Sequence, residues 1–308
     1  MNLVFFGSSS FSLPAFLALA SAAQHRLVGV AAQPDRPSGR NRRIQPGIIH
    51  QAALDHGIPI ILPEKIGAED AMATLRAWAP DAIAVASYGQ YIPTRVLNLP
   101  PHGAVNVHPS LLPKYRGAAP LQWSIARGET LSGVTIFRVV KDMDAGDILA
   151  QEQHAIEPDE TATQLSDRFS RIGADMLLKV LDQLEGGTAL ATPQDHAAAT
   201  YAPKIEKHDG LLDWQKPAID LHNRIRGFQP WPGCYFHHEG RPIKVWRSRP
   251  EPGGGEPGAV VDTAGPGPLI MTGDQALRLL ELQPEGKKPM PGDAFLRGIR
   301  WTCGLRLG

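Results

Sequence analysis

Short apolar runs alternate with segments of helical periodicity through the first half of the chain. The apolar runs lie at residues 3–6, 27–32 and 81–86, and a further run ends at Val105. The segments at 12–22, 45–56 and 67–78 have the pattern expected of helices. Nearly continuous apolar runs are typical of strands that are covered on both faces. The alternation therefore predicts an α/β fold with a doubly wound, mostly parallel sheet.

The pattern changes towards the C-terminus. Apolar residues recur at three- and four-residue steps over 165–184, which predicts a long helix that ends at Gly186. Residues 188–208 lack a clear period and are interpreted as a connector. Beyond them, short apolar runs separated by Gly and Pro lie at 243–246, 258–261, 269–271 and 277–282, and they predict a small β-barrel or sandwich. We expect one domain over 1–203 and a second over 209–308.

Composition narrows the class of protein. The 308 residues include 31 basic and 31 acidic side chains, so a polyanionic partner would have to meet a local patch of charge. Two cysteines without a paired spacing indicate thiols in a reducing compartment. The sequence shows neither a signal-peptide pattern nor an apolar stretch of membrane-spanning length. We expect a cytoplasmic protein with no membrane partner and, without a recognisable dimerisation seam, a monomer.

Polar side chains gather where the strand that contains Val105 ends. Asn106 and His108 are two residues apart, so they point the same way in an extended segment, and Pro109 then breaks the strand. An Asn amide can donate to a developing oxyanion, and a His can donate or accept a proton. No Ser, Cys or Lys nearby is arranged as a nucleophile. The pair fits a reaction in which a substrate supplies the nucleophile; the plainer alternative is a polar strand end with a structural His.

The loop DMDAGD at 142–147 places three carboxylates close together in the sequence. Calcium binding is one alternative, but the EF-hand pattern needs Gly at its sixth position and Glu at its twelfth. This chain has Asp147 and Gln153 there, which disfavours calcium. A solvated turn is the other alternative. We prefer Asp144 as the group that orients His108, a contact that spacing alone does not establish.

Two further segments bear on the choice of ligand. The turn that begins at Gly7 lacks the GxGxxG pattern, which disfavours a classical dinucleotide site. The segment 33–43 carries Arg36, Arg40, Arg42 and Arg43 among turn-forming residues. Its composition is equally consistent with a mobile solvated loop and with an arm that grips phosphates.

Several motifs together are similar to those of the formyltransferase family that uses 10-formyltetrahydrofolate. They are NVHPSLLPKYRGAAPLQW at 106–123, QPDRPSGR at 33–40, TYAPKI at 200–205, QPWPG at 229–233 and LQPEGKKPM at 282–290. The resemblance covers nearly the whole chain and is closest to the branch that formylates methionyl initiator tRNA. It implies a Rossmann-like formyltransferase domain followed by an OB-like, tRNA-binding β-barrel. It also implies formyl transfer from 10-formyltetrahydrofolate to the α-amino group of initiator methionyl-tRNA, for translation initiation and without a metal.

By this resemblance, Asn106, His108 and Asp144 match the family's catalytic trio. The residues that match the folate site are Ser87, Tyr88, Gly89, Gln90, Ser110, Leu111, Leu112, Pro113 and Asp142. The Arg-rich segment matches an arm that the family inserts at the end of the tRNA acceptor stem, and Arg40 aligns with its key arginine. The chain departs from the family pattern at Ser8 and Ser9, where Thr-Pro is usual, and at 41–43, where Gly-Lys-Lys-like residues are usual.

Two other classes of function remain open. A formyltransferase for an amino-sugar nucleotide, or a formyl-folate hydrolase, would use the same Asn-His-Asp trio without tRNA. The segment 33–43 would then be an ordinary loop. A non-catalytic tRNA- or folate-binding protein would tolerate substitution of the trio. Formyl transfer to initiator methionyl-tRNA, measured with and without the trio intact, distinguishes these classes.

Overall fold

The computed structural model describes residues 1–38 and 43–307, which form two compact units. The N-terminal unit comprises Met1–Gly117, Ser132–His154 and Ser166–Tyr201, and the C-terminal unit comprises Ala118–Leu131, Ala155–Leu165 and Ala202–Gly308. The C-terminal unit thus includes two segments that precede residue 166. The contiguous boundaries 1–203 and 209–308, with a connector at 188–208, stay a prediction.

A seven-stranded sheet forms the centre of the N-terminal unit, in the order β10-β9-β7-β6-β1-β2-β5. Its strands are β1 (Asn2–Gly7), β2 (Arg26–Ala31), β5 (Ile60–Ile61), β6 (Ala82–Ala86), β7 (Ala104–His108), β9 (Leu131–Arg138) and β10 (Ile148–Ala155). The pairs among β5, β2, β1, β6 and β7 are parallel, whereas β7 and β9 run antiparallel. The mostly parallel, doubly wound sheet is confirmed. Its topological switch point lies between β1 and β6, where such sheets bind ligands at the carboxyl ends of their strands.

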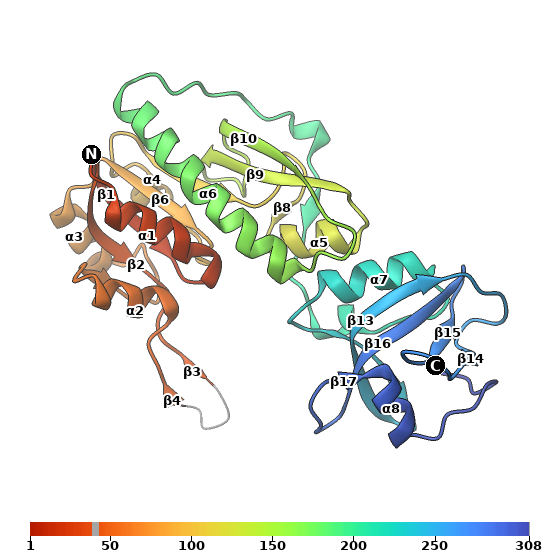
Figure 1. Cartoon of the computed structure of the whole chain (residues 1–308). Helices are drawn as coiled ribbons and strands as arrows, with labels where there is room; N and C mark the ends of the chain where they lie inside the picture. Colours follow the sequence, from red (N-terminus) through yellow and green to blue (C-terminus); the bar gives the residue numbers. More distant parts are fainter. Residues whose placement is uncertain (39–42, 308) are drawn as a thin grey trace. The chain divides into compact units, whose positions relative to one another are not determined.

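Helices cover both faces of this sheet (Figure 1). They are η1 (Ser10–Ser12), α1 (Leu13–Ser21), α2 (Ile48–Asp55), α3 (Glu69–Trp78), α4 (Thr94–Leu97), α6 (Ala162–Glu185) and η2 (His196–Ala198). On one face, Val4 and Phe6 of β1 share a buried cluster with Leu75 of α3 and with α4. On the other face, Phe5 contacts Phe16 of α1. Apolar side chains on both faces explain why β1 reads as a continuous apolar run.

The Arg-rich segment begins and ends in a short hairpin, which projects from the sheet in Figure 1. Its strands are β3 (Pro37–Ser38) and β4 (Arg43–Ile44), and they pair antiparallel. The Asp35 carboxylate joins the two sides of the hairpin base. It accepts a hydrogen bond from Gly47 N at 2.8 Å and lies 2.7 Å from His50 Nδ1. The predicted RNA-binding residues Arg40 and Arg42 lie outside the described residues.

The C-terminal unit is built on a six-stranded antiparallel sheet. Its strands are β12 (Cys234–His238), β13 (Arg241–Glu251), β14 (Val260–Asp262), β15 (Leu269–Met271), β16 (Ala276–Pro284) and β17 (Met290–Pro291), and its helical elements are α5 (Pro120–Ala126), η3 (Lys207–Gly210), α7 (Ala218–Gly227) and α8 (Gly292–Gly298). The remaining two-stranded sheet joins β8 (Arg116–Gly117) to β11 (Tyr201–Ala202). The expected antiparallel β unit is confirmed. Its closure into an OB-like barrel stays a prediction.

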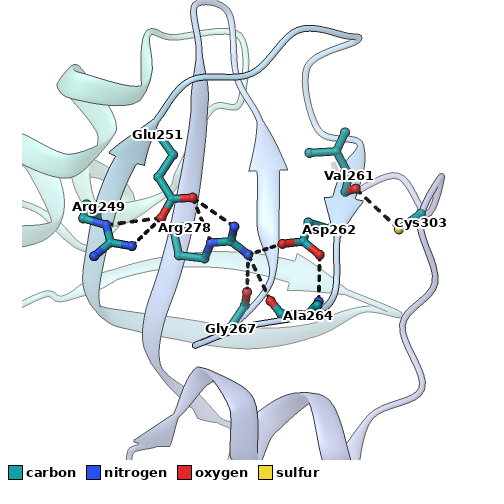
Figure 2. Close-up of polar contacts among 8 residues, drawn as sticks. All are labelled: Arg249, Glu251, Val261, Asp262, Ala264, Gly267, Arg278 and Cys303. Carbon is teal, nitrogen blue, oxygen red and sulfur yellow. Dashed lines mark hydrogen bonds and ion pairs between the residues drawn. The ribbon is translucent and has the colours of Figure 1, made fainter.

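One buried arginine joins three strands of the C-terminal sheet (Figure 2). Arg278 on β16 is 8% exposed and pairs with Glu251 of β13 at 2.9 Å and Asp262 of β14 at 2.7 Å. Its guanidinium also donates to the carbonyl oxygens of Gly267, at 2.9 Å, and Ala264, at 3.2 Å. A buried charge is tolerated only when it is paired and hydrogen-bonded, as it is here. This cluster therefore fastens the edge of the sheet to the turn before β15.

Candidate active site

Asn106 has a buried amide oxygen that is left without a partner. Its strand β7 lies between β6 and β9, and Asn106 pairs with Val85 on one side and Phe137 on the other. Within the part of the chain that the structure describes, Asn106 Oδ1 is buried and makes no hydrogen bond. Burying an amide without a partner costs free energy, so an unpaired amide at a strand end indicates a group that a ligand completes. A half-turn about the Cβ–Cγ bond presents the NH₂ in place of the oxygen.

His108 is held by contacts to both of its ring nitrogens. The side chain is 4% exposed, and its ring edge packs against Phe137. Nε2 lies 3.0 Å from the carbonyl oxygen of Tyr115, so this nitrogen carries the proton that is donated there. Nδ1 lies 3.8 Å from Asp144 Oδ2. With Nε2–H occupied, Nδ1 accepts a proton in neutral His108 and donates one only in the imidazolium form, whose charge Asp144 stabilises.

The structure brings Asp144 to His108, as the sequence analysis preferred. Asp144 has a positive φ of 50°, which is uncommon for a residue with a side chain. Its Oδ2 accepts a hydrogen bond from Gly117 N at 2.8 Å. Gly146 closes the same loop, because a Cβ at this position would overlap the carbonyl oxygen of Arg138. The loop therefore returns tightly against β9 and carries one carboxylate to the end of β7.

A cleft of about 460 Å³ lies at the switch point of the sheet. Its lining includes Ser8 and Ser9 after β1, residues 32–36 after β2, residues 45–47, 49 and 50 on the far side of the hairpin, and Ser87, Tyr88 and Gly89 after β6. The predicted folate residues at 87–89 thus meet the predicted RNA residue Arg36 in one cleft. Asn106, His108 and Asp144 do not line it.

The ring of Tyr88 packs in the core, whereas its hydroxyl has no hydrogen-bond partner among the described residues. Its ring packs on Phe6 with centroids 5.1 Å apart, and its hydroxyl is buried with no partner among the described residues. Burial raises the pKa of Tyr88 well above its ordinary value, so the hydroxyl stays a hydrogen-bond donor. Gln90 differs, because its amide is already bonded to Ile66 N and to the carbonyl oxygen of Pro63. Of these two predicted folate residues, Tyr88 therefore carries a wholly unpartnered polar group among the described residues, whereas both ends of the Gln90 amide are already bonded.

The predicted folate segment from Ser110 to Pro113 is folded on itself. The Ser110 hydroxyl donates to the carbonyl oxygen of Lys114 at 2.7 Å, and the Ser110 carbonyl accepts from Thr135 Oγ1 at 2.6 Å. Leu112 is 3% exposed and is followed by a cis peptide bond to Pro113. Leu111 is half-buried, whereas Asp142 is exposed. The side-chain hydroxyl and most backbone groups of this segment shape a turn, which leaves apolar surface and the exposed Asp142 for contact with a ligand.

Arg36 is exposed on the wall of the cleft. Its Nη2 lies 3.2 Å from Glu64 Oε2, and both side chains are about 70% exposed. Such an exposed pair contributes little to stability and is readily exchanged for a phosphate. The geometry is therefore compatible with the predicted contact to RNA. Arg43 belongs to β4, and only its backbone is described.

Several polar groups to which the sequence analysis assigned no role lie at the same sheet edge. Ser8 Oγ donates to the carbonyl oxygen of Tyr88 at 3.1 Å and accepts from Gln33 N at 3.0 Å. Gln33 Nε2 donates to the same Tyr88 oxygen at 3.0 Å. These bonds tie together the segments that follow β1, β2 and β6, where the usual Thr-Pro is replaced by two serines. Their position directly after predicted strands was the available signal.

Among residues 1–38 and 43–307, no cluster of three or more His, Cys, Asp or Glu side chains is arranged to hold a metal ion. No helix in these ranges has both the length and the apolar character needed to cross a membrane.

The chain matches two family models and many full-length relatives. Residues 1–181 match formyl transferase, and residues 204–300 match formyl transferase, C-terminal domain. Relatives from Solibacter usitatus, Chloroflexus aurantiacus and Geobacter metallireducens, each named methionyl-tRNA formyltransferase, are 43%, 42% and 38% identical to this chain. The alignments cover 100% of this chain and 99%, 100% and 99% of the relatives, respectively.

Solved structures share the fold at lower identity. The sugar 3N-formyl transferase WlaRD, in the presence of dTDP and 5-N-formyl-THF, has a TM-score of 0.68 at 18% identity, over 94% of this chain and 99% of WlaRD. HypX from Aquifex aeolicus, in complex with tetrahydrofolic acid, has a TM-score of 0.66 at 19% identity, over 100% of this chain and 50% of HypX. These two likenesses concern the fold alone. The family models and the full-length relatives show that the chain belongs to the methionyl-tRNA formyltransferase family, whose members transfer a formyl group.

Proposed function

We propose that the protein transfers the formyl group of 10-formyltetrahydrofolate to the α-amino group of methionyl initiator tRNA, for translation initiation. The observation that carries the proposal is the buried amide oxygen of Asn106, unpartnered among the described residues and two residues from the His108 that pairs with Asp144, at the end of β7. Donors at a strand end suit a carbonyl that becomes an oxyanion. Membership of the family indicates which carbonyl and which amine meet there.

The proposed reaction begins with attack of the neutral amine on the formyl carbon. A new C–N bond forms, and the carbonyl oxygen takes the negative charge of a tetrahedral intermediate. We assign the Asn106 amide and protonated His108 as the donors to that oxygen. Asp144 orients His108 and accepts the proton of the amine, directly or through water. Collapse of the intermediate breaks the bond to the folate nitrogen, which takes a proton as tetrahydrofolate leaves.

The contacts of His108 support this division of roles. Because Nε2–H is directed at the carbonyl oxygen of Tyr115, only Nδ1 is available to a substrate. An imidazolium at this position pairs with Asp144, so it can donate from Nδ1 while its charge is compensated. The donor set needs no metal to polarise the formyl oxygen.

The folate site is proposed from the family motif together with the cleft. Ser87, Tyr88 and Gly89 line the cleft, and the buried Tyr88 hydroxyl lacks a partner among the described residues. A hydroxyl donor of this kind can recognise a polar edge of a pteridine. Gln90, Ser110, Leu111, Leu112, Pro113 and Asp142 complete the proposed set. HypX, which has the same fold, binds tetrahydrofolic acid.

The tRNA would be held by the arm and by the C-terminal domain. We propose that the acceptor end of the tRNA is contacted by Arg36, Arg40, Arg42 and Arg43, and that the domain over 209–308 binds the rest of the tRNA. We also propose that the enzyme is a cytoplasmic monomer. An arm that enters a weak terminal base pair opens it at low cost, which favours an initiator tRNA with such a pair. The projecting hairpin of β3 and β4 is consistent with this role.

The first test is formyl transfer by the full chain from 10-formyltetrahydrofolate to purified initiator methionyl-tRNA. Elongator methionyl-tRNA and the His108→Ala variant serve as controls. Rapid transfer to the initiator, lost in the variant, supports the proposal. Release of formate, or formylation of an amino-sugar nucleotide in place of tRNA, would be consistent with the proposed catalytic residues but would show that tRNA is not the substrate. Full function of the His108 variant would indicate a non-catalytic binding protein.

Arg40→Ala is expected to weaken binding of initiator tRNA and to reduce the preference for it over elongator tRNA. Loss of one phosphate contact lowers the slope of log affinity against log salt by about one. Affinity measured at several salt concentrations checks this expectation. Arg95→Ala is the matched control, because Arg95 is an exposed arginine of the same unit that pairs with Glu69, outside the arm. Unchanged affinity and preference in Arg40→Ala would remove the arm from the mechanism.

A further inference from the structure

Gln194 lies in the segment that the sequence pattern identifies only as a connector. The side chain is 5% exposed, and both ends of its amide are used. Nε2 donates to the carbonyl oxygen of Asp144 at 2.9 Å and to that of Gly146 at 2.7 Å. Oε1 accepts from Arg116, at 3.2 Å from Nε and 2.6 Å from Nη2. A fully bonded buried amide of this kind specifies one arrangement of the chain around it.

The loop that Gln194 contacts is held in an unfavourable conformation. Asp144 has a φ of 50°, and a residue with a side chain persists there only when its surroundings impose it. Two contacts impose it here, since Gly117 N holds the carboxylate and Gln194 holds the backbone carbonyl. Gln194 is thus one of the two contacts that hold the Asp144 backbone in this conformation, and it is the one that acts on the backbone carbonyl.

Arg116 determines which way the Gln194 amide faces. The guanidinium is 4% exposed and can only donate, so the amide oxygen must turn towards it and the NH₂ towards the loop. The neighbours of Arg116 hold the two members of the pair. The Tyr115 carbonyl holds His108 Nε2, and Gly117 N holds Asp144 Oδ2. Residues 115–117 and Gln194 thus form one continuous support for the His108–Asp144 pair.

We propose that Gln194 is a positioning residue for formyl transfer, which holds the 144–146 backbone so that the Asp144 carboxylate stays beside His108. The inference rests on the proposed function, because it gives Asp144 a role in the reaction. Misplacement of a catalytic group by about 1 Å can cost about 10²-fold in rate. Loss of Gln194 is therefore expected to lower kcat about 10–100-fold, with the KM values for folate and tRNA changed by about twofold or less.

Two variants separate positioning from general support of the fold. Gln194→Met keeps the length and loses every hydrogen bond. Gln194→Glu keeps an acceptor for Arg116 but replaces the donor with a carboxylate that faces two carbonyl oxygens. Both are expected to lose kcat. Gln194→Glu keeps its link to Arg116, so its melting temperature is expected to fall less than that of Gln194→Met, although the carboxylate still faces the two carbonyl oxygens. Gln51→Met is the matched control, since the Gln51 side chain is exposed and its amide donates to Asp55 at 2.8 Å, away from the 144–146 loop.

A double-mutant cycle with Asp144→Asn gives the deciding measurement. If Gln194 acts through Asp144, Gln194→Met lowers kcat in the parent and causes little further loss in Asp144→Asn. An equal loss in both backgrounds, or a parental kcat in Gln194→Met, would overturn the inference. Gln194→Glu enters the same cycle if the Met variant does not fold. Parental activity of Asp144→Asn alone would instead contradict the proposed function.

Discussion

Asn106→Ala is expected to lower kcat for formyl transfer about 10²–10³-fold, the usual cost of removing one oxyanion donor. The amide oxygen is buried and unpartnered among the described residues, so part of the amide is already desolvated before substrate arrives, and a half-turn of the amide presents its NH₂ there. The donor is therefore preorganised for the developing charge. Because the charge is present only in the transition state, KM values should change much less than kcat.

Steady-state kinetics with each substrate varied in turn measure this effect. Asn98→Ala is a suitable control, because Asn98 is an exposed asparagine at the end of α4 in the same unit. Asn106→Ala should not reduce the melting temperature, since it removes an unpaired buried polar group. An unchanged kcat, or a loss explained entirely by unfolding, would exclude Asn106 as an oxyanion donor.

The effects of Asn106 and His108 are expected to be strongly non-additive. Both would donate to one oxygen, so removing either already disables much of the same interaction. The Asn106→Ala/His108→Ala double variant should therefore lose less activity than the product of the single losses. A multiplicative loss would indicate that the two side chains act in separate steps.

Arg278→Met is expected to destabilise the C-terminal sheet by about 1–3 kcal/mol, because several acceptors lose a buried donor, although Glu251 keeps its pair with Arg249. Glu251 and Asp262 both bond to Arg278, and the carbonyl oxygens of Ala264 and Gly267 lose their donor as well (Figure 2). Local stability is measured by amide hydrogen exchange in β13, β14 and β16, since a chain with two units need not unfold in one step.

The matched control for Arg278 is Arg297→Met. Arg297 also pairs with a carboxylate, Asp293 at 2.7 Å, but its side chain is 70% exposed. An exposed pair contributes at most about 0.5 kcal/mol on a helix, so this variant should exchange like the parent. Equal protection in Arg278→Met and Arg297→Met would mean that the cluster is not what fastens the sheet edge.

The same cluster makes stability depend on pH in the acid range. The hydrogen bond from Arg278 is the main cause that lowers the pKa of Glu251. The pKa of Asp262 is lowered first by the Ala264 N–H and then by Arg278. Carboxyl groups with lowered pKa values stabilise the fold fully above their unfolded values, which are about 4.3 for Glu and 3.9 for Asp. That stability is lost as the pH falls through the folded pKa values.

Arg278→Met should therefore weaken this acid dependence, mainly through Glu251. Asp262 keeps its bond from Ala264 N at 2.8 Å, and Glu251 keeps its bonds from Arg249, so part of the dependence should remain for both. Hydrogen exchange measured between about pH 3 and pH 7 compares the pH dependence of local stability in Arg278→Met and in the parent. This range includes the pKa values of Asp and Glu in the unfolded chain. If Arg278→Met had the same acid dependence as the parent, that dependence would have to arise from carboxylates outside this cluster.

Hydrophobic patterning was sufficient to predict the core of the N-terminal unit. The runs at 3–6 and 81–86 became β1 and β6, because strands covered on both faces must be apolar throughout. The short helices α5, α7 and α8 were missed. In the structure α5 packs against α7, and α7 and α8 pack against the C-terminal sheet, so tertiary contacts support these short helices.

The candidate site likewise has one part that the sequence predicted and one part that it did not. The two-residue spacing of Asn106 and His108 determined by itself that both point to one face of a strand, since side chains alternate with a period of two. Spacing could not decide that Asp144 lies 3.8 Å from His108, because the loop at 142–147 reaches β7 only through the turn beyond β9. The partner of that loop, Gln194, is 50 residues from Asp144 and carries no local signal.

The sequence by itself determined the strand runs, the polar strand end and the family motifs, because each depends on residues that are close together in the chain. Tertiary structure alone decided which distant groups complete the site. Arg116 turns the Gln194 amide, and Gln194 holds the Asp144 loop. Contacts of this kind are made between loops at the end of a sheet, where neither periodicity nor propensity specifies the partner. The packing of the strands that carry these loops determines which loops meet.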